Sequence, residues 1–180
     1  GAEMCKFVLK TRTPASRLGT IRDIVIDNIV AHPRGTSTIT GHAGKARRFR
    51  IADTLGVLDP FSTHELIRSL RCTVDLEIEM HAHNDLGLAT ANSLAAVKAG
   101  ATHINTTVNG LGERAGNVPL EDTVLALKTM YGVDLGIKTE LFCETSKFVL
   151  DLAKVTIPGN RPIVGDLLYQ IESGIVAGFF

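Results

Sequence analysis

Residues 74–117 read VDLEIEMHAHNDLGLATANSLAAVKAGATHINTTVNGLGERAGN. The order of apolar and turn-forming residues predicts a strand at 74–80, a helix over 88–99 and a second strand at 102–108. Gly100 follows the predicted helix, as glycine often does where a helix ends. A strand, a helix and a further strand in this order are typical of a parallel sheet with right-handed crossovers.

The same alternation continues on both sides of this stretch. Ser62 and Glu65 have the spacing of a capping box, which predicts Ser62 as the N-cap of a helix. Glu121 and Asp122 stand in the first turn of another predicted helix, where the helix dipole favours acidic side chains. The remaining elements that the pattern predicts are a strand at 49–52 and helices over 62–71, 120–131 and 140–153.

Polar residues follow each predicted strand, at 53–54, 81–85 and 109–117. In parallel α/β folds the chemistry is carried by the loops at the carboxyl ends of the strands. Because several successive strands contribute, the pattern favours a (β/α)8 TIM barrel over a Rossmann sheet. A whole barrel takes about 250 residues, and this chain has 180. We therefore expect an α/β fold that is a partial TIM barrel, about its C-terminal half.

Three regions are expected along the chain. Residues 1–47 are an atypical N-terminal segment, residues 48–155 a portion of the catalytic barrel, and residues 156–180 the start of a segment that follows the barrel. Within the first region only residues 21–30 look regular, and their apolar positions fit a helix slightly better than a strand.

The composition excludes several classes of function. Lysine plus arginine equals aspartate plus glutamate, 19 each, so no net charge favours nucleic acid or an anionic membrane. No window has the length and apolarity of a transmembrane helix, and the first residues do not resemble a secretory signal. The three cysteines are far apart and odd in number, which favours a reducing compartment. We expect a cytoplasmic protein.

His81 and His83 are the candidate metal ligands. They lie two residues apart at the end of a predicted strand, and side chains at this spacing point to the same face. Two imidazoles that converge on one point are typical ligands of a borderline divalent ion. Glu79 lies two residues before His81 and is expected on the same face. The alternative is that one histidine is a satisfied core residue and the other caps a loop.

Residues 109–117, NGLGERAGN, form the second polar cluster. Their GxGxxxG spacing differs from the dinucleotide-binding pattern, so we reject a Rossmann site. The glycines allow close approach of a ligand to the backbone. Glu113 and Arg114 are expected to pair, and Asn117 offers an amide oxygen to a metal or substrate. The alternative is a glycine-rich turn with a surface ion pair.

Thr54 offers a hydroxyl for a substrate carboxylate, and its alternative role is helix capping. Asp53 is expected to orient neighbouring backbone. His103 lies within a predicted strand and is interpreted as structural, and the sequence around His64 has no metalloprotease spacing.

The sequence of residues 80–122 resembles the second signature of the homocitrate synthase and isopropylmalate synthase family, the metal-dependent TIM-barrel enzymes of Claisen condensation. Residues 48–60, RFRIADTLGVLDP, are similar to the strand segment that precedes it in that family. Within the family, HINTTVNGLGERAGN is most similar to the homocitrate synthases of nitrogen fixation.

The resemblance implies a role for each matching residue. His81 and His83 correspond to metal-binding histidines, and Asn117 to an asparagine at or beside the metal. Thr54 corresponds to a threonine that binds the 2-oxo acid carboxylate, and Glu79 to a glutamate near the substrate; both are the expected catalytic residues. The GERAGN loop, residues 112–117, corresponds to the segment that closes over the site near the acyl-CoA, and Asn109, Glu113 and Arg114 are expected to bind substrate.

The activity implied is condensation of acetyl-CoA with 2-oxoglutarate, a 2-oxo dicarboxylic acid, to give homocitrate and CoA. The implied cofactor is a divalent metal, with Mg, Mn, Zn, Fe and Co all open. The implied assembly is a homodimer or a pair with a complementary chain. Isopropylmalate, citramalate and Re-type citrate synthases, a lyase of the same architecture and an inactive remnant stay as alternatives.

Two motifs depart from the family pattern. In the family a strand motif, DxTLRDGEQ, supplies an acidic metal ligand and an arginine for the ketone oxygen. In this chain only residues 20–23, TIRD, weakly resemble it. Ile171 and Val176 stand where the family's HESGIH motif has histidines. Both departures put the activity of this chain alone in question.

Overall fold

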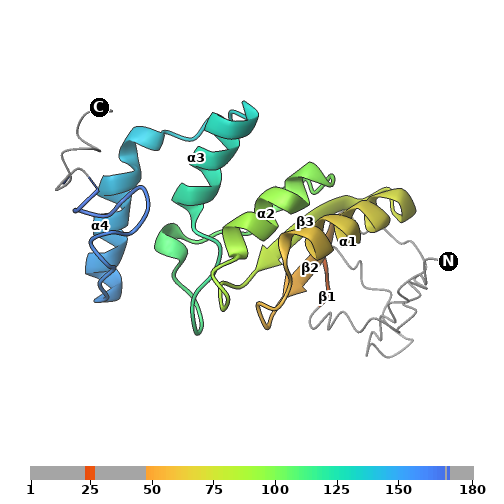
Figure 1. Cartoon of the computed structure of the whole chain (residues 1–180), viewed down its shortest axis with the longest axis horizontal. Coiled ribbons are helices and arrows are strands. Elements are labelled where there is room, and N and C mark those ends of the chain that lie inside the picture. Colours follow the sequence, from red (N-terminus) through yellow and green to blue (C-terminus); the bar gives the residue numbers. More distant parts are fainter. Residues whose placement is uncertain (1–22, 27–47, 169, 171–180) are drawn as a thin grey trace, which may run out of the picture. The chain divides into compact units, whose positions relative to one another are not determined.

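The computed structural model describes residues 23–26, 48–168 and 170. They belong to two compact units, one ending at Asn105 and one beginning at Thr106. Each unit is described by itself below, with the element labels of Figure 1. Most of the region at 1–47 and the tail at 171–180 lie outside the described residues, and so do residues 20–22 of the weak match at 20–23 to the DxTLRDGEQ motif.

A four-stranded parallel sheet forms the centre of the first unit. The strands are β1 (Asp23–Ile26), β2 (Arg48–Asp53), β3 (Glu77–Ala82) and β4 (His103–Ile104), and they lie in the order of the sequence. Two helices connect the last three strands, α1 (Pro60–Thr73) and α2 (Ala89–Lys98). This βαβαβ arrangement confirms the predicted parallel α/β class and is consistent with part of a barrel.

The helix favoured for 21–30 is wrong where the structure describes it, because residues 23–26 form β1. Its backbone pairs in parallel with β2 from Asp23 beside Arg48 to Ile26 beside Ile51. Ile24, Val25 and Ile26 are consecutive β-branched residues, which pack well in a sheet and have restricted side chains in a helix. Pairing with β2 and the strand preference of these β-branched residues therefore decide the structure at 23–26, against the weak helical spacing of apolar residues in 21–30.

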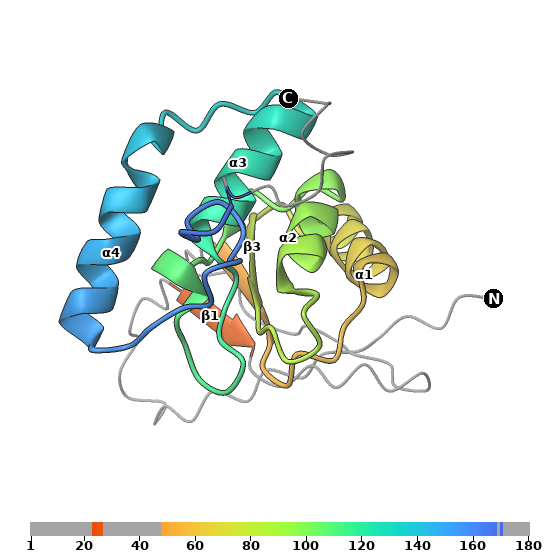
Figure 2. The same ribbon diagram turned by 60° about the vertical axis from the view of Figure 1, so that its left-hand side comes forward.

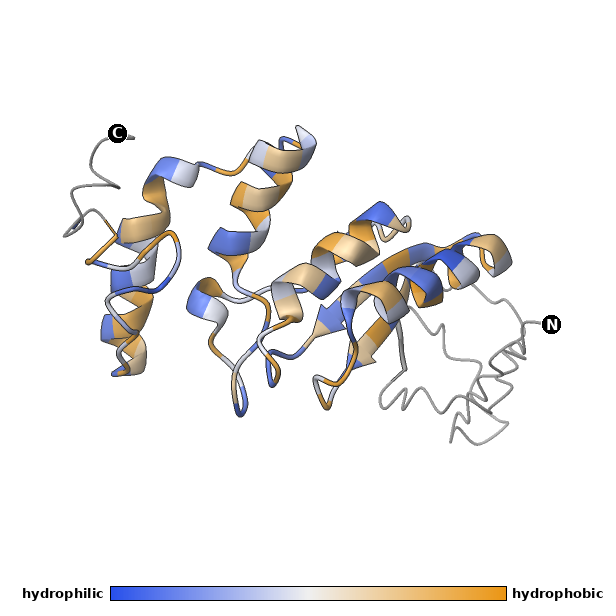
Figure 3. Cartoon of the chain, in the orientation of Figure 1, coloured by the Kyte–Doolittle hydropathy of each residue, from blue (hydrophilic) through white to orange (hydrophobic). Residues whose placement is uncertain are grey.

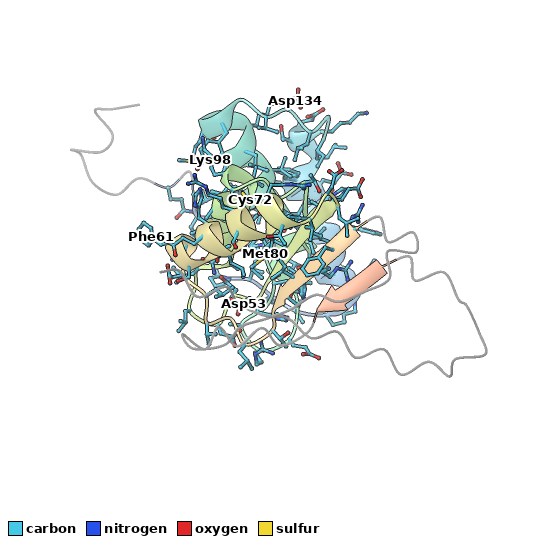
Figure 4. The ribbon with its side chains drawn as sticks, turned by 90° about the vertical axis from the view of Figure 1, so that its right-hand side faces the viewer. Asp53, Phe61, Cys72, Met80, Lys98 and Asp134 are labelled. Atoms are coloured by element: carbon cyan, nitrogen blue, oxygen red, sulfur yellow. The ribbon has the colours of Figure 1, made fainter. Side chains whose placement is uncertain are left out.

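The two faces of the sheet differ in chemistry. Phe49 and Ile51 of β2 and Ile78 and Met80 of β3 are almost completely buried. Figures 1 and 2 show α1 and α2 side by side along the sheet, and α2 contacts β3. In Figure 4 Met80 lies at the centre of this layer, while Phe61 projects from the start of α1. The opposite face carries polar side chains, namely the charged Arg48, Arg50, Glu77 and Glu79 together with His81.

The start of α1 differs from the prediction. The N-cap is Asp59, whose carboxylate accepts hydrogen bonds from the backbone N–H groups of Phe61 and Ser62 at 2.8 and 3.0 Å. Pro60 occupies the first helical turn, where the lack of an N–H costs nothing. Ser62 is therefore inside the helix, and its hydroxyl donates to Asp59.

The second unit contains two α-helices preceded by short turns. A 3-10 turn, η1 (Val108–Gly110), precedes α3 (Leu120–Tyr131), and η2 (Thr139–Leu141) leads into α4 (Phe142–Ala153). Both α-helices were predicted and are confirmed. Val124, Phe142 and Val164 form the buried cluster of this unit, together with partly buried Leu120 and Ile163. Figure 3 shows hydrophobic and hydrophilic residues alternating along α4, as expected of an amphipathic helix.

The strand predicted at 102–108 ends after two paired residues. Thr102 replaces part of the ladder with its side chain, because its hydroxyl accepts from the N–H of Ile78 at 3.0 Å and donates to the carbonyl of the same residue at 3.1 Å. Beyond Asn105 the backbone turns, and Asn109 has a left-handed φ of 60°. Among the described residues, no helix is long and apolar enough to cross a membrane.

Candidate functional site

His81 and His83 lie side by side at the carboxyl end of β3. Their ring centroids are 4.9 Å apart, and the rings are nearly perpendicular at 81°. The spacing of two residues along an extended backbone produces this contact, as the sequence predicted. His81 is half-buried and His83 is buried, so both imidazoles are held within the protein surface.

A chain of polar contacts leads from the charged face of the sheet to His81. The guanidinium groups of Arg48 and Arg50 contact the Glu79 carboxylate at 3.1 and 2.7 Å. The Asn105 amide nitrogen lies 3.5 Å from Glu79 Oε1, and Asn105 Oδ1 lies 3.0 Å from His81 Nδ1. Because His81 Nδ1 is engaged in this way, Nε2 is the ring nitrogen left to bind a ligand.

Burial and charge set the protonation states in this chain of contacts. Burial opposes ionisation of Glu79, but the hydrogen bonds and charges of Arg50 and Arg48 outweigh it and hold the pKa of Glu79 below its ordinary value. Burial also lowers the pKa of His81, assisted by the nearby His83 and opposed by the hydrogen bond with Asn105. A neutral imidazole is the form that binds metals.

His83 has an unusual feature for a buried histidine. Its Nδ1 atom is inaccessible and makes no hydrogen bond within the described part of the chain. Buried polar atoms are usually paired, so this nitrogen calls for an explanation. A ligand or a rearranged ring is a physical way to satisfy it.

The loop between β2 and α1 is organised by Asp53. Its carboxylate accepts from the N–H groups of Val57 and Leu58, both at 3.1 Å, which confirms the expected backbone-orienting role. Asp53 is buried at the end of β2 in Figure 4. Thr54 follows it at the strand end and is partly exposed.

In the second unit the loop over 109–117 folds tightly on itself. A Cβ atom at Gly112 would collide with the Asn117 side chain, and one at Gly116 would collide with the carbonyl of Gly110. The glycines are therefore required for the packing of the loop itself. Glu113 and Arg114 form the predicted ion pair at 3.8 Å, and both are exposed.

Asn117 and Asn109 have different surroundings within this loop. Asn117 donates its amide to the carbonyl of Leu111, and its Oδ1 is buried with no hydrogen-bond partner among the described residues. Asn109 donates its amide to the Ser146 carbonyl and accepts from the Ser146 hydroxyl, while its backbone N–H donates to Glu121. The contacts of Asn109 are those of a structural residue.

Two histidines are fewer than a complete metal site needs. Among the described residues, no group of three or more His, Cys, Asp or Glu side chains is arranged to hold a metal ion. The donor set nevertheless fits half of such a site, because two adjacent imidazoles and the unpartnered His83 nitrogen are suited to a divalent ion. His81 and His83 belong to the first unit, and Asn117 belongs to the second.

Sequence reasoning missed Asn105 and the two arginines beside Glu79. Arg48 and Arg50 pair in register with Glu77 and Glu79 on the neighbouring strand. The matching i, i+2 spacing of opposite charges in two successive strands was the available signal. His103 was interpreted as structural, and its Nε2 lies 2.7 Å from an Arg48 nitrogen, in agreement with that interpretation.

Comparison with known protein families identifies the family of this chain. The model of the HMGL-like family matches residues 10–149. The chain belongs to the HMGL-like family. The curated relatives of this family member include a 2-isopropylmalate synthase of Caldanaerobacter subterraneus, 53% identical over 130 residues, and a homocitrate synthase of Nostoc, 50% identical over 132 residues. A putative (R)-citramalate synthase of Archaeoglobus fulgidus is 48% identical over 131 residues.

These matches cover 72 to 73% of this HMGL-like chain but only 27 to 35% of the relatives. The chain thus spans about a third of the length of the curated relatives that it matches. The three kinds of synthase match this chain at nearly equal identity, 53, 50 and 48%. These identities do not single out the homocitrate synthases among them.

Solved structures support the fold. The HMG-CoA lyase of Bacillus subtilis superposes with a TM-score of 0.57 at 24% identity, covering 63% of this chain and 40% of the lyase. The carboxyl transferase domain of Rhizobium etli pyruvate carboxylase superposes with a TM-score of 0.55 at 25% identity, covering 67% of this chain and 19% of that chain. The HMGL-like chain therefore shares the βα arrangement of this TIM-barrel family.

Proposed function

We propose that this chain carries the metal-binding and substrate-binding strand ends of an acyl-CoA condensing synthase. The reaction proposed is acetyl-CoA plus 2-oxoglutarate plus water giving homocitrate and CoA. The observation that carries the proposal is the pair of adjacent imidazoles, His81 and His83, at the end of β3 in a chain of the HMGL-like family. The chain spans about a third of the length of the curated relatives that it matches.

The two histidines would hold the divalent ion through nitrogen donors. The chemistry that such an ion supplies when bound is Lewis-acid polarisation of the 2-oxo group. His81 suits this role because its Nδ1 is engaged by Asn105, which leaves Nε2 as the ring nitrogen for a ligand. Asn117 is proposed as an oxygen donor on the family resemblance alone. Mg, Mn, Zn, Fe and Co are all candidates.

The proposed substrate contacts come from polar residues at a strand end and on an exposed turn. Thr54 donates its hydroxyl to the carboxylate of the 2-oxo acid, and Glu79 keeps the polar chain to His81 in place from within the sheet. Glu113 and Arg114 lie on an exposed turn suited to contact acetyl-CoA, the proposed second substrate. We leave Asn109 out of the substrate site because its side chain is already bonded to Ser146.

Bond changes in the proposed reaction are those of a Claisen condensation. A proton leaves the methyl group of acetyl-CoA, and the resulting enolate carbon attacks the ketone carbon of 2-oxoglutarate. The ketone oxygen gains a proton and becomes the hydroxyl of the product. Water then cleaves the thioester, which releases CoA as the thiol and leaves the new carboxylate.

Metal titration tests the premise of the proposal. Mn²⁺ binding to the full chain, followed by electron paramagnetic resonance, is expected to weaken strongly in His81→Ala and in His83→Ala. His64→Ala is the matched control, because His64 is a partly exposed histidine on α1. Equal Mn²⁺ affinity in all four proteins would contradict the proposed site.

A thiol-release assay tests the substrate. The full chain is incubated with Mn²⁺, acetyl-CoA and one of four acids: 2-oxoglutarate, 2-oxoisovalerate, pyruvate or oxaloacetate. Release of CoA with 2-oxoglutarate supports the homocitrate reaction, whereas preference for another acid assigns the corresponding synthase instead. Metal binding without CoA release from any acid would contradict activity of the chain alone and favour a role beside a complementary chain.

A further inference from the structure

Asn105, which the sequence did not suggest as a site residue, links Glu79 to His81 in the series of polar contacts on the sheet. It is the last residue of the first unit and follows β4 directly. Its backbone N–H donates to the carbonyl of Met80 at 2.9 Å, which fixes the residue beside the end of β3. From this position its side chain contacts Glu79 on one side and His81 on the other.

The Glu79 carboxylate determines which atom of the Asn105 amide donates and which accepts. Glu79 is paired with two guanidinium groups, so its carboxylate acts as an acceptor. The amide of Asn105 must then turn its nitrogen toward Glu79, since only the nitrogen can donate. This leaves Oδ1, which only accepts, facing His81 Nδ1 at 3.0 Å.

An acceptor opposite Nδ1 requires that His81 carries its proton there. A neutral imidazole has one protonated nitrogen, so Nε2 keeps a free lone pair. A lone pair on Nε2 is what a metal ion needs from this ring, and a hydrogen bond from the other ring nitrogen is the usual way to orient a ligating histidine.

We propose that Asn105 is a positioning residue that selects the Nδ1–H tautomer of His81 and thereby presents Nε2 to the divalent ion. The inference rests on the proposed metal-binding function of His81, and it assigns a task to a residue outside the ligand set. Arg48 and Arg50 hold the Glu79 carboxylate, Glu79 orients the amide of Asn105, and Asn105 in turn orients the His81 ring.

An asparagine is suited to this place because it has both a donor and an acceptor. Aspartate at 105 would keep an acceptor for His81 but could not donate to the Glu79 carboxylate, and the two like charges would repel. Leucine has a similar size and offers neither group. These two replacements therefore separate the contact with His81 from the contact with Glu79.

The tautomer can be read without any metal. The full chain, labelled with ¹⁵N-histidine, gives ring-nitrogen signals whose shifts distinguish a protonated nitrogen from a bare one. The signals of His81 are assigned by their loss in His81→Gln. At a pH where His81 is neutral, the wild type is expected to show a protonated Nδ1 and a bare Nε2, and Asn105→Asp is expected to keep this pattern.

Asn105→Leu is expected to lose the pattern, with the proton moving to Nε2 in most molecules. Its Mn²⁺ affinity is expected to fall by about 10- to 100-fold, the range for loss of a hydrogen-bond partner of a ligating histidine. Asn160→Leu is the matched control, because Asn160 is exposed in the second unit. It should change neither the signals of His81 nor the Mn²⁺ affinity.

An unchanged His81 pattern in a folded Asn105→Leu protein would overturn the inference. So would a bare Nδ1 in the wild type, a result that does not depend on how Asn105→Leu folds. The proposed function fails separately, if Mn²⁺ affinity is insensitive to His81→Ala while the tautomer pattern of the wild type is as expected.

Discussion

Asn109 and Ser146 exchange two hydrogen bonds. The Ser146 hydroxyl donates to Asn109 Oδ1 at 2.6 Å, and the Asn109 amide donates to the Ser146 carbonyl at 3.2 Å. Both side chains are buried, and the pair joins η1 to α4 within the second unit. The asparagine that the sequence suggested for substrate binding is thus part of the internal structure of this unit.

Removal of the hydroxyl in Ser146→Ala is expected to lower the free energy of unfolding by about 1–3 kcal/mol, because Asn109 Oδ1 is left buried without a partner. Urea denaturation followed by circular dichroism measures the change. Ser69→Ala, at an exposed position of α1, is the control and should differ little from wild type. A Ser146→Ala protein as stable as this control would refute the structural role of the pair.

Gly116→Ala is expected to destabilise the chain by at least about 2 kcal/mol, since strain and overpacking both act there. Gly116 has a φ of +95°, and an added Cβ would meet the Gly110 carbonyl. Gly132→Ala is a matched control, with a φ of +67° and no atom within 4 Å of the added Cβ. It should lose only about 1–2 kcal/mol from backbone strain. Similar losses in the two variants, measured by urea denaturation, would show that the loop relaxes easily.

Glu79 is expected to make the stability depend on pH. Its pKa in the folded chain lies below the ordinary value of 4.5, because the arginine contacts outweigh burial. The stabilisation is therefore complete above that value and is lost as the pH falls below it through the folded-state pKa. Glu79→Gln should be less stable by about 1–3 kcal/mol at neutral pH.

The same variant should also have a flatter stability curve in acid. Unfolding free energies measured from neutral pH down to the acid range test this, with Glu65→Gln on the exposed side of α1 as the control. Parallel curves for wild type and Glu79→Gln would mean that the ion pairs contribute nothing to acid sensitivity.

Thr102→Val is expected to cost about 1 kcal/mol of unfolding free energy. Valine has nearly the same shape but no hydroxyl, so the N–H of Ile78 loses the acceptor now at 3.0 Å. Thr129→Val, at an exposed helical position where the hydroxyl bonds the carbonyl of Leu125, serves as the comparison. Hydrogen exchange at the Ile78 amide should accelerate in Thr102→Val alone; unchanged protection of that amide would contradict the assigned bond.

The positions of the regular elements followed from short-range patterns. The helices over 120–131 and 142–153 are amphipathic or bounded by turn residues, and their limits agree with expectation to within two residues. The N-cap of α1 was misplaced because Asp59 and Ser62 are both good capping residues. Only the position of Pro60, which is favoured in the first turn, distinguishes them.

The candidate site was predictable only where it depends on spacing within one strand. His81 and His83 meet because they are two residues apart, which the sequence shows directly. Asn105 lies 24 residues from His81, and its contact depends on the pairing of β3 with β4. The task of Asn109 likewise depends on a partner 37 residues away. Contacts of this kind require the tertiary structure.

Arg48 contacts side chains on two other strands, Glu77 and Glu79 of β3 and His103 of β4. Strands of a parallel sheet are far apart in the sequence, and a slip of one residue would turn every side chain to the other face. For Arg48 such a slip would place a guanidinium against the apolar layer that now holds Phe49. In the native alignment Arg48 reaches all three partners, whereas the slipped alignment would exchange these contacts for a guanidinium buried against apolar side chains. Arg48 therefore favours the native alignment of the three strands over the slipped one.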